Sequence, residues 1–461
     1  MFCSTYRTVF IQFLLISASI AQEGGIKGIV SDISGLPLPG ANIQLKNTQY
    51  GTTSDVNGEF EFSSIPNGYY VLTVNYIGYE PVIYPDVWVR PNAYDKIDIL
   101  LTQLVIEFDR VLVEDSYFKN SGLNQDHSVT FRNDEIRRAP GSGQEISRIL
   151  NSLPSVASVG ENRQDMMVRG GGPTENGFII DNIPIPSISH FSQDDGRSNG
   201  PIGLINTEMI ESLEFYSNGF TAKYGNRLSS YGDIVYRSGN TDKVEGNLSL
   251  GLGGAGTLVE GPIGKNSTYI FSFRRSYLDV IAGALNAGGL PSYDDIQGKI
   301  TFQPNHYNTF TLLSVNGNSL YERTKEDAIN EDQTNYGNRK NKQHTVGINY
   351  RKIWNQSSFS NSSISYSSQH ANGYFKDSFT GALTSRANND MQSYSFRQIN
   401  QTKFSNKSNV EYGFESSSKE FRYDFLLNDL SSSQSISITN TSFFSTFRYL
   451  LTSKLLVSTG M

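Results

Sequence analysis

Histidine, cysteine and acidic side chains are the groups from which most enzymes build a catalytic or metal centre, and this chain scatters them. None of its histidines has a glutamate three residues on, so the sequence lacks the helical spacing of a zinc peptidase. These five residues are His127, His190, His306, His344 and His370. A Gly-x-Ser-x-Gly nucleophile turn and a Walker phosphate loop are also missing from the sequence. The sequence therefore predicts a protein that is not an enzyme, with no cofactor and no metal.

The single cysteine, Cys3, precedes an apolar stretch at residues 9–16 that follows the positive charge of Arg7. Small residues around Ala21 complete the pattern of a signal peptide with its cleavage site. The stretch is shorter than the ~18–20 residues that a membrane-spanning helix needs, which disfavours the alternative of a transmembrane anchor. We therefore expect residues 1–21 to be removed on export, leaving a mature chain without thiol chemistry or disulfides.

The composition is typical of a chain built from strands and turns. Charged residues make up 18% and hydrophobic residues 37% of the 461 residues, whereas aromatic residues reach 12% and glycine occurs 42 times. The formal net charge is −7 and no basic run occurs, so nucleic acid is not an expected partner. After the signal peptide no window of ~18 apolar residues remains, so the chain would cross a membrane only as β-strands.

Residues 22–103 are expected to form an Ig-like β-sandwich. Short strand candidates alternate with turn residues, and the strongest turn signal is Asn57-Gly58, because both residue types tolerate positive φ. The strand candidates are residues 25–31, 41–47, 59–63, 69–76 and 96–102. Asp55 raises the alternative of a calcium loop, but the further acidic positions and the closing glutamate of such a loop are absent.

Residues 104–240 change character, and we expect a linker over 104–115 and a small α+β domain over 116–240. Residues 142–145 fit a capping box, and an apolar helical face then runs until Pro154. That face consists of Ile146, Ile149, Leu150 and Leu153. Strand candidates follow at residues 166–169, 177–181, 212–216 and 233–237. The glycine cluster at 170–172 indicates sharp turns or close backbone approach.

From residue 241 to 461, apolar or aromatic residues alternate with polar ones, as at Tyr269, Phe271 and Phe273, over about ten strand candidates. This pattern is typical of an antiparallel transmembrane β-barrel with a polar interior. A soluble sandwich or propeller is the alternative, which the unequal loops and the absence of a visible repeat disfavour. Because an open sheet would leave backbone groups unpaired in lipid, we expect these strands to be the first part of a larger, incomplete barrel.

The order of these parts resembles the TonB-dependent outer-membrane receptors of the Bacteroidetes type. The first part resembles their carboxypeptidase-regulatory-like domain, the second their plug domain and the third the N-terminal part of their barrel. The first resemblance is carried by residues 28–30, 39–43, 52–55, 57–60 and 77–79. The plug resemblance is carried by residues 153–156, 168–171, 179–184, 210–214, 219–220, 224–225 and 227–230, which include Arg169, Gly170, Gly171, Asp181, Asn182, Tyr224 and Gly225. Residues 274–279 resemble an early barrel segment of the same group.

The resemblance implies active transport of a scarce solute across the outer membrane of a Gram-negative cell. Energy would come from the inner-membrane proton-motive force through TonB, to which an extended box of the receptor would add as a strand. The candidate TonB box consists of Asp109, Arg110, Val111, Leu112, Val113 and Glu114, with an ordinary first strand of the plug as the alternative. A surface lipoprotein, the partner in glycan importers, is less expected, because their run of valines and glycines is absent here.

The resemblance and the chemistry of the residues also predict roles for particular side chains. Asn182 stands where the family usually has glycine, and because asparagine tolerates positive φ we expect the Asp181-Asn182 hairpin to survive. We expect Arg169 and Asp181 to act structurally inside the barrel, as an ion pair or as contacts to its wall, with a solvated strand end as the alternative for Arg169. Ligand contacts are expected in the extracellular barrel loops and in the plug loop over 187–200, whose alternative is an ordinary polar loop. The candidates there are His190, Phe191, Asp194 and Asp195.

The solute stays open among siderophore, cobalamin, oligosaccharide and peptide, because specificity in such receptors resides in loops without a transferable code. The barrel itself would have outer-membrane lipid as its neighbour. A binding or signalling receptor of the outer membrane that does not transport is the alternative function.

Overall fold

The computed structural model describes residues 23–461 with short gaps, and it divides into two compact units, residues 1–115 and 116–461. The gaps are residues 33–34, 47, 78, 80, 91–92, 102–127, 140–144, 159–162, 194–196, 199–201, 218, 252–253, 278–290, 306, 356, 406, 429 and 453–454. The predicted signal peptide and the candidate TonB box both lie outside the described residues.

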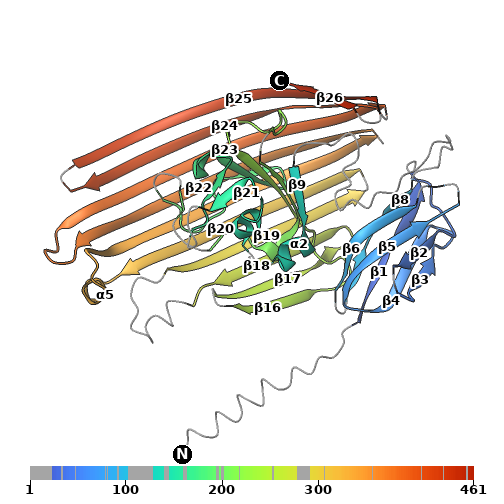
Figure 1. Cartoon of the computed structure of the whole chain (residues 1–461), viewed down its shortest axis with the longest axis horizontal. Helices are drawn as coiled ribbons and strands as arrows, with labels where there is room; N and C mark the ends of the chain where they lie inside the picture. The colour runs from blue at the N-terminus through green and yellow to red at the C-terminus, as the bar shows by residue number, and fades with distance from the viewer. Residues whose placement is uncertain are drawn as a thin grey trace, which may run out of the picture. The chain divides into compact units, whose positions relative to one another are not determined.

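The first unit is a sandwich of two four-stranded sheets (Figure 1). In one sheet, β1 (Glu23–Asp32) pairs with β4 (Glu59–Pro66), β7 (Tyr94–Lys96) and β8 (Ile99–Leu101). The other sheet runs in the order β3 (Gly51–Thr53), β2 (Asn42–Leu45), β5 (Gly68–Asn75) and β6 (Val82–Val89). Alternate side chains of both sheets share one buried core, including Ile26, Ile43, Phe60 and Val74. The predicted sandwich is confirmed, although the sequence patterns missed β3 and β6 and predicted a single strand over 96–102 where the chain forms β7 and β8.

A tight turn stands at the predicted Asn57-Gly58 position, but only Gly58 takes a positive φ, 77°. A Cβ at Gly58 would lie 2.5 Å from the carbonyl oxygen of Val30, so glycine is required for space as well as for conformation. The Asp55 carboxylate accepts backbone hydrogen bonds from Asn57 at 2.9 Å and Glu59 at 2.8 Å. These bonds make Asp55 a turn cap, consistent with the turn rather than the calcium-loop interpretation.

The second unit begins with a small α+β domain, residues 128–240, which we call the plug. Its five-stranded sheet has the order β13-β12-β15-β14-β9, and β10 and β11 form a separate hairpin. The strands are β9 (Ser128–Arg132), β10 (Val156–Ser158), β11 (Met166–Val168), β12 (Asn176–Ile180), β13 (Ile183–Ile185), β14 (Ile210–Tyr216) and β15 (Ser230–Tyr236). The helical elements are α2 (Asn133–Arg138), α3 (Ile146–Leu150), η1 (Pro173–Glu175) and η2 (Thr207–Met209).

The predicted apolar helix is α3, whose Ile146, Ile149 and Leu150 are buried in the plug core. The helix is shorter than the sequence pattern predicts, because it ends at Leu150, while Leu153 packs against the core from the turn that follows. Glu145 is its N-cap residue but makes no side-chain cap bond. The remainder of the predicted capping box, residues 142–144, lies outside the described residues.

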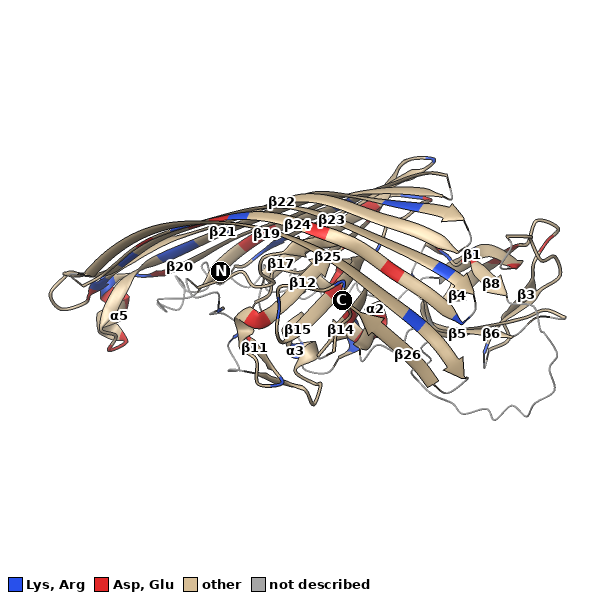
Figure 2. Ribbon diagram, turned by 90° about the horizontal axis from the view of Figure 1, so that it is seen from above, with Lys and Arg blue, Asp and Glu red and all other residues tan. Residues whose placement is uncertain are grey.

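The remainder of the unit, from residue 245 onward, is one antiparallel sheet of eleven strands, which we call the wall. Every strand pairs with its sequence neighbours, in the order of the chain, and Figure 2 shows the sheet arching over the plug strands. The strands are β16 (Glu245–Gly251), β17 (Gly254–Gly264), β18 (Ser267–Arg275), β19 (Ser292–Asn305), β20 (Asn308–Arg323), β21 (Asn335–Asn355), β22 (Ser358–Asp377), β23 (Leu383–Ser405), β24 (Ser408–Leu427), β25 (Leu430–Thr452) and β26 (Leu455–Gly460). The predicted large antiparallel sheet is confirmed, with one strand more than expected.

The two ends of the wall differ. Tight turns join β17 to β18, β19 to β20, β21 to β22, β23 to β24 and β25 to β26 at one end, the short-turn end. At the opposite end, the long-loop end, the connections after β18, β20 and β22 are longer, and the one after β20 includes the helix α5 (Lys325–Asn330). Outer-membrane barrels have short periplasmic turns and longer extracellular loops, so the asymmetry of the wall has the form of such a barrel.

The two faces of the wall differ in chemistry as the alternation predicts. On β19, Asp295, Gln297 and Lys299 are buried against the plug, whereas Ile296 between them is 52% exposed on the other face. The exposed face carries further large apolar side chains, namely Phe271, Phe273, Leu312, Ile348, Ile364, Tyr394, Phe396, Tyr412, Phe443 and Phe447. An apolar band of this size on one face fits contact with lipid. Among the described residues, no helix combines the length and apolarity that a membrane crossing requires.

Candidate site at the interface of plug and wall

The plug and the wall share one hydrophobic core. Leu258, Ile270, Leu313 and Val315 of wall strands β17, β18 and β20 belong to the same buried cluster as the core residues of the plug. Fully burying a side chain of this kind contributes roughly 1.5–3 kcal/mol, so these four contacts fix the plug to this part of the wall. The plug is therefore held by the first wall strands through packing before any polar contact is considered.

A buried polar cluster lies beside this core and centres on Asp295 of β19. Its carboxylate lies 2.9 Å from His190 Nε2 of the plug and accepts from Arg274 Nε of β18 at 3.0 Å. Arg274 also donates to the plug carbonyl of Leu204 at 2.6 Å, as does the amide of Gln297 at the same distance. Because the charges of Arg274 and Asp295 are paired and further hydrogen-bonded, they can remain ionised away from water.

Two plug groups in this cluster have shifted protonation equilibria. Burial lowers the pKa of His190, despite the opposing effect of its bond to Asp295, so the imidazole is neutral in the folded plug. Burial raises the pKa of Glu145 to about 7, against the opposing attraction of Arg274 and a 2.7 Å hydrogen bond from the Gly203 amide. Glu145 is therefore the group of this cluster that titrates near neutrality.

A second anchor is the predicted hairpin turn between β12 and β13. Asp181 and Asn182 adopt φ of 48° and 67°, so asparagine does replace glycine at a positive-φ position, as expected. The Asp181 carboxylate accepts from Lys299 Nζ of β19 at 3.1 Å, which makes it a contact to the wall. Ser363 Oγ donates to the Asn182 carbonyl at 2.7 Å, and Arg397 donates to the Asn182 side chain at 3.2 Å. The turn thus joins plug and wall at three strands, β19, β22 and β23.

The Tyr224-Gly225 motif forms a third contact region. The Tyr224 ring stacks on Tyr231 with centroids 4.8 Å apart, and its hydroxyl donates to Asp233 at 2.7 Å. The Tyr231 hydroxyl in turn donates to the Gly225 carbonyl at 2.5 Å. Arg397 of the wall donates to the carbonyl of Lys223 at 2.7 Å. The motif therefore presents a rigid aromatic surface and a backbone carbonyl to β23.

The Arg169-Gly170-Gly171 motif is a turn of the plug. Arg169 and Gly170 have φ of 48° and 83°, and the Arg169 side chain is exposed. A Cβ on Gly171 would lie 2.6 Å from Ser229, so close approach excludes any larger residue there. The alternative in which Arg169 pairs with Asp181 has no support in the described contacts, since Asp181 pairs with Lys299.

The candidate ligand residues His190 and Phe191 are 5% exposed each, and His190 faces Asp295 of the wall. Their role as ligand contacts stays a prediction, and Asp194 and Asp195 lie outside the described residues. Sequence reasoning did not single out the wall partners as anchors. They could have been found as charged residues at the alternate, inward-facing positions of strands whose outward-facing positions are apolar. These wall partners are Arg274, Asp295, Lys299 and Arg397.

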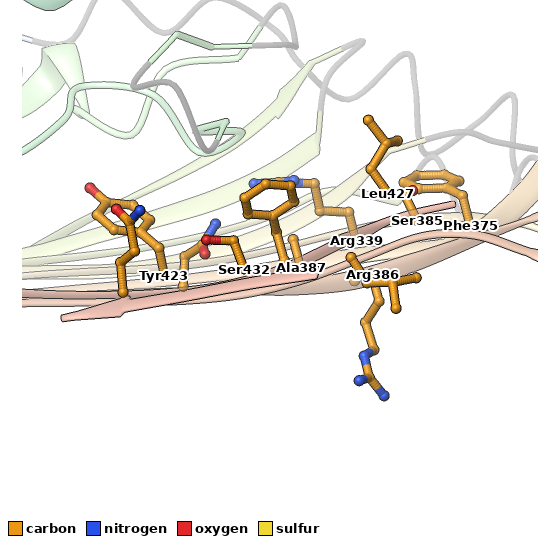
Figure 3. Close-up of a pocket in the computed structure, with 13 residues that line it drawn as sticks. Arg339, Phe375, Ser385, Arg386, Ala387, Tyr423, Leu427 and Ser432 are labelled. Carbon is orange, nitrogen blue, oxygen red and sulfur yellow. The ribbon is translucent and has the colours of Figure 1, made fainter. Parts of the chain in front are cut away.

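At the long-loop end, the inner face of β21–β25 is hollowed by a pocket of about 490 Å³ (Figure 3). In Figure 3 the side chains of Arg339, Phe375 and Tyr423 lie on one side of the sheet, whereas Arg386 points to the other. An arginine beside aromatic rings can hold a ligand by charge and by stacking. Within the described part of the chain, no group of three or more His, Cys, Asp or Glu residues could hold a metal ion.

Comparison with protein families assigns two segments of the chain. Residues 25–102 match the carboxypeptidase regulatory-like domain, and residues 123–230 match the TonB-dependent receptor plug domain. The TonB-dependent receptor SusC of Bacteroides thetaiotaomicron is 29% identical over 228 residues, which cover 47% of this chain and 21% of that protein. A TonB-dependent receptor of Formosa agariphila is 26% identical over 240 residues, covering 50% of this chain and 21% of the relative. The matches thus span about a fifth of the length of these curated relatives.

Solved structures share the fold of the chain. A mutant of the ferric enterobactin receptor of Pseudomonas aeruginosa superposes with a TM-score of 0.54 at 15% identity, covering 74% of this chain and 58% of that one. The siderophore receptor PirA of Acinetobacter baumannii gives a TM-score of 0.54 at 15% identity, covering 74% and 57%. At such low identity the likeness extends to the fold alone.

Proposed function

Because the chain resembles TonB-dependent receptors and carries their plug domain packed against a wall of antiparallel strands, we propose that it serves TonB-dependent uptake of a scarce solute across the outer membrane. The observation that supports this most is the seating of the plug. It shares a hydrophobic core with β17–β20 and makes buried polar contacts to β18, β19, β22 and β23. A domain attached in this way can close a wide pore and still be released by force.

The energetic argument runs from the membrane. The outer membrane has no ATP supply, so concentrating a solute there requires work delivered from the inner membrane through a protein. In this proposal Asp109–Glu114 pairs as an extended strand with TonB and transmits a pull to the plug. Hydrogen bonds and packing at the plug–wall interface would then break in sequence, which opens a path for the solute.

The solute would first meet the long-loop end of the wall, where Arg339, Phe375 and Tyr423 line the 490 Å³ pocket. The fold neighbours differ in what their names say they bind: one is a ferric enterobactin receptor, one a siderophore receptor and one a copper transporter. The pocket combines an arginine with aromatic rings, which suits a solute with both an acidic and an apolar part. We leave the identity of the solute open between siderophore, cobalamin, oligosaccharide and peptide.

The test is an uptake assay in cells that carry the full receptor and its own TonB system. Candidate solutes are supplied with and without a protonophore, and accumulation is compared with surface binding. We expect accumulation that stops with the protonophore, while binding persists. Deleting residues 107–114 should abolish accumulation and leave surface binding intact, because the segment lies before the described plug. Binding without energy-dependent accumulation in the unaltered receptor would favour the non-transporting receptor and overturn the proposal.

A further inference from the structure

The two ends of the N-terminal sandwich differ in the chemistry of their exposed side chains. One end, which we call the apolar end, is where β1, β5 and β8 finish and where β2, β4 and β6 begin. The turns at the opposite end carry exposed polar residues, such as Gln49 and Asn67. All the large hydrophobic residues that are exposed in the described part of the sandwich lie toward the apolar end, namely Leu36, Val56, Ile77, Ile83 and Leu100.

Two tight turns at the apolar end place a β-branched apolar residue at their first central position. A backbone hydrogen bond of 3.0 Å closes the turn over 55–58, in which Val56 is 83% exposed. Another of 3.1 Å closes the turn over 76–79, in which Ile77 is 97% exposed. Turns favour Gly, Pro, Asn, Asp and Ser for their backbone conformation, so the turns themselves do not account for valine and isoleucine.

Both turns are held firmly, so their tips are presented outward. The rings of Tyr76 and Tyr79 lie 5.4 Å apart between centroids and pack against the sandwich core, which leaves Ile77 outside. The Asp55 carboxylate accepts the two backbone hydrogen bonds that shape the turn of Val56. Because the core and the carboxylate fix these loops, neither tip can be buried within the sandwich itself.

Leu36 adds a third exposed tip from the neighbouring loop, and 62% of it is exposed. Its amide donates to the Asp32 carboxylate at 2.9 Å, which fixes the loop at its base. A Cβ on Gly58 would lie 3.0 Å from Cβ of Pro37, so this loop and the turn of Val56 touch each other. Single exposed apolar residues are common on protein surfaces, but a group of them on adjoining loops marks a site of contact with another surface.

The chemistry of the three loops favours lipid over protein as that surface. Protein interfaces centre on contiguous patches rich in Trp, Tyr and Arg, whereas the tips here are aliphatic and stand on separate loops. A fluid hydrocarbon layer can receive separate tips without matching their shape. The loops over 33–41, 54–58 and 76–81 contain no Lys or Arg, so attraction to anionic headgroups plays no part. The apolar end therefore suits a zwitterionic lipid surface.

The chain also leaves the sandwich at the apolar end. Strand β8 runs parallel to β1 and ends at Leu101, opposite Asp32, while the plug begins with β9 at Ser128. Residues 102–127 can span at most roughly 90 Å, at ~3.3–3.6 Å per residue. The apolar end is thus tethered to the unit that contains the wall, within reach of any membrane that holds the wall.

We propose that the sandwich docks by its apolar end on the periplasmic leaflet of the outer membrane, with Leu36, Val56 and Ile77 inserted at the boundary between headgroups and acyl chains. This inference rests on the proposed uptake function only for the membrane in which the wall sits. Docking keeps the point where the chain leaves β8, and with it the start of the linker to the plug, at the membrane surface.

The test uses single cysteines in the purified full-length receptor, on a background in which Cys3→Ser removes the only native thiol. Ile77→Cys carries a nitrobenzoxadiazole label, whose emission reports polarity, and the receptor is reconstituted into phosphatidylcholine vesicles. Lipids with brominated acyl chains then quench the label only where it touches the membrane interior. Asn67→Cys, in an exposed turn at the opposite end of the sandwich, is the matched control.

We expect blue-shifted emission and quenching by brominated lipid at position 77, and water-like, unquenched emission at position 67. Water-like emission at position 77 would overturn the docking. A blue shift without quenching would overturn it as well, because it would show that protein, and not lipid, covers the apolar end.

Variants test whether the tips themselves provide the attraction. With the label at Val56→Cys, Ile77→Ser should lower the ratio of docked to free sandwich at least about tenfold, equivalent to ~1.4 kcal/mol, whereas Ile77→Leu should retain it. Equal ratios for the serine and leucine variants would refute the role of Ile77. Replacing part of the phosphatidylcholine by phosphatidylglycerol should not increase the ratio, and a clear increase would refute the zwitterionic surface.

The outcome is separable from that of the proposed function, because the fluorescence measurement needs no TonB, energy or solute. A receptor that binds without transporting would still show quenching at position 77. Conversely, energy-dependent accumulation together with an unquenched label would retain the uptake function and reject the docking.

Discussion

Replacing the Asp295 carboxylate tests whether the buried cluster holds the plug to the wall. Asp295→Asn leaves the shape of the side chain but removes the charge that faces Arg274, whose partly buried side chain bonds both Asp295 and the plug. Breaking a buried ion pair by removing one partner costs about 3–5 kcal/mol. Arg274 keeps the carbonyls of Gly203 and Leu204 as hydrogen-bond acceptors, so we expect a loss of stability at the lower end of this range, about 3 kcal/mol.

This loss corresponds to an increase on the order of 10²-fold in the equilibrium constant for opening the plug–wall contact. Hydrogen exchange of plug peptides that include Gly203 and Leu204, read by mass spectrometry in detergent, measures that equilibrium. The matched control is Asp294→Asn, one residue away on the opposite face of β19, where the carboxylate accepts a bond from Asn318 of the neighbouring strand. Exchange that rises equally in both variants, or in neither, would refute the idea that Asp295 anchors the plug.

A double replacement separates charge pairing from mere disruption. Arg274→Met together with Asp295→Leu removes both charges and keeps apolar volume, and such exchanges of a buried pair are often neutral or stabilising. We expect the plug peptides of this double variant to exchange more slowly than those of Asp295→Asn alone. The opposite order would show that the hydrogen bonds of Asp295, and not its charge balance with Arg274, hold the interface.

Three further predictions concern pH, close approach and the outer face. Because Glu145 has a pKa raised to about 7 in the folded plug, the folded state binds more protons than the unfolded state above about pH 4.5. The free energy of unfolding should therefore fall by roughly 3 kcal/mol as the pH rises from about 4.5 to 7. In thermal melts, Glu145→Gln should flatten this dependence of stability on pH. Gly171→Ala should destabilise the plug by about 1–3 kcal/mol in denaturant titrations, since the new Cβ would lie 2.6 Å from Ser229, whereas Gly172→Ala, with open space around it, should be near neutral. Ile364→Arg places a charge on the apolar outer face of β22. If that face meets the membrane core, the variant should lose about 2–4 kcal/mol of folding free energy when the protein refolds into lipid vesicles. An effect no larger than that of Ser357→Arg, in the short turn, would contradict the orientation of the wall.

Much of the fold follows from local pattern. Alternation along Tyr269–Phe273 and its repetition down the chain predicted a large antiparallel sheet with one apolar face, because side chains of a strand alternate strictly between faces. The Asp181-Asn182 turn was also predictable, since the conformational tolerance of asparagine is a property of the residue itself. The sandwich core was predictable for the same reason, although β6 escaped because Pro85 interrupts its pattern.

The anchoring residues were harder to predict, because a buried polar group depends on its partner. Asp181 and Lys299 are separated by 118 positions, and Asn182 and Arg397 by 215, so no local window contains both members of a pair. His190 illustrates the difficulty: its loop is polar in sequence, yet the side chain is buried against Asp295. Nothing in the loop itself indicates that contact.

The length of the wall strands has a consequence for capture. Strand β23 has 23 residues and β21 has 21, whereas a tilted strand crosses a bilayer with about 9–11. If the wall spans a bilayer with its short-turn end at the periplasm, ten or so residues of these strands would extend beyond the lipid and raise the rim by roughly 25 Å at a tilt near 45°. That height is about three Debye lengths in physiological salt. An approaching molecule at the rim would therefore be largely shielded from the surface charge of the bilayer, and its encounter rate would depend little on lipid composition.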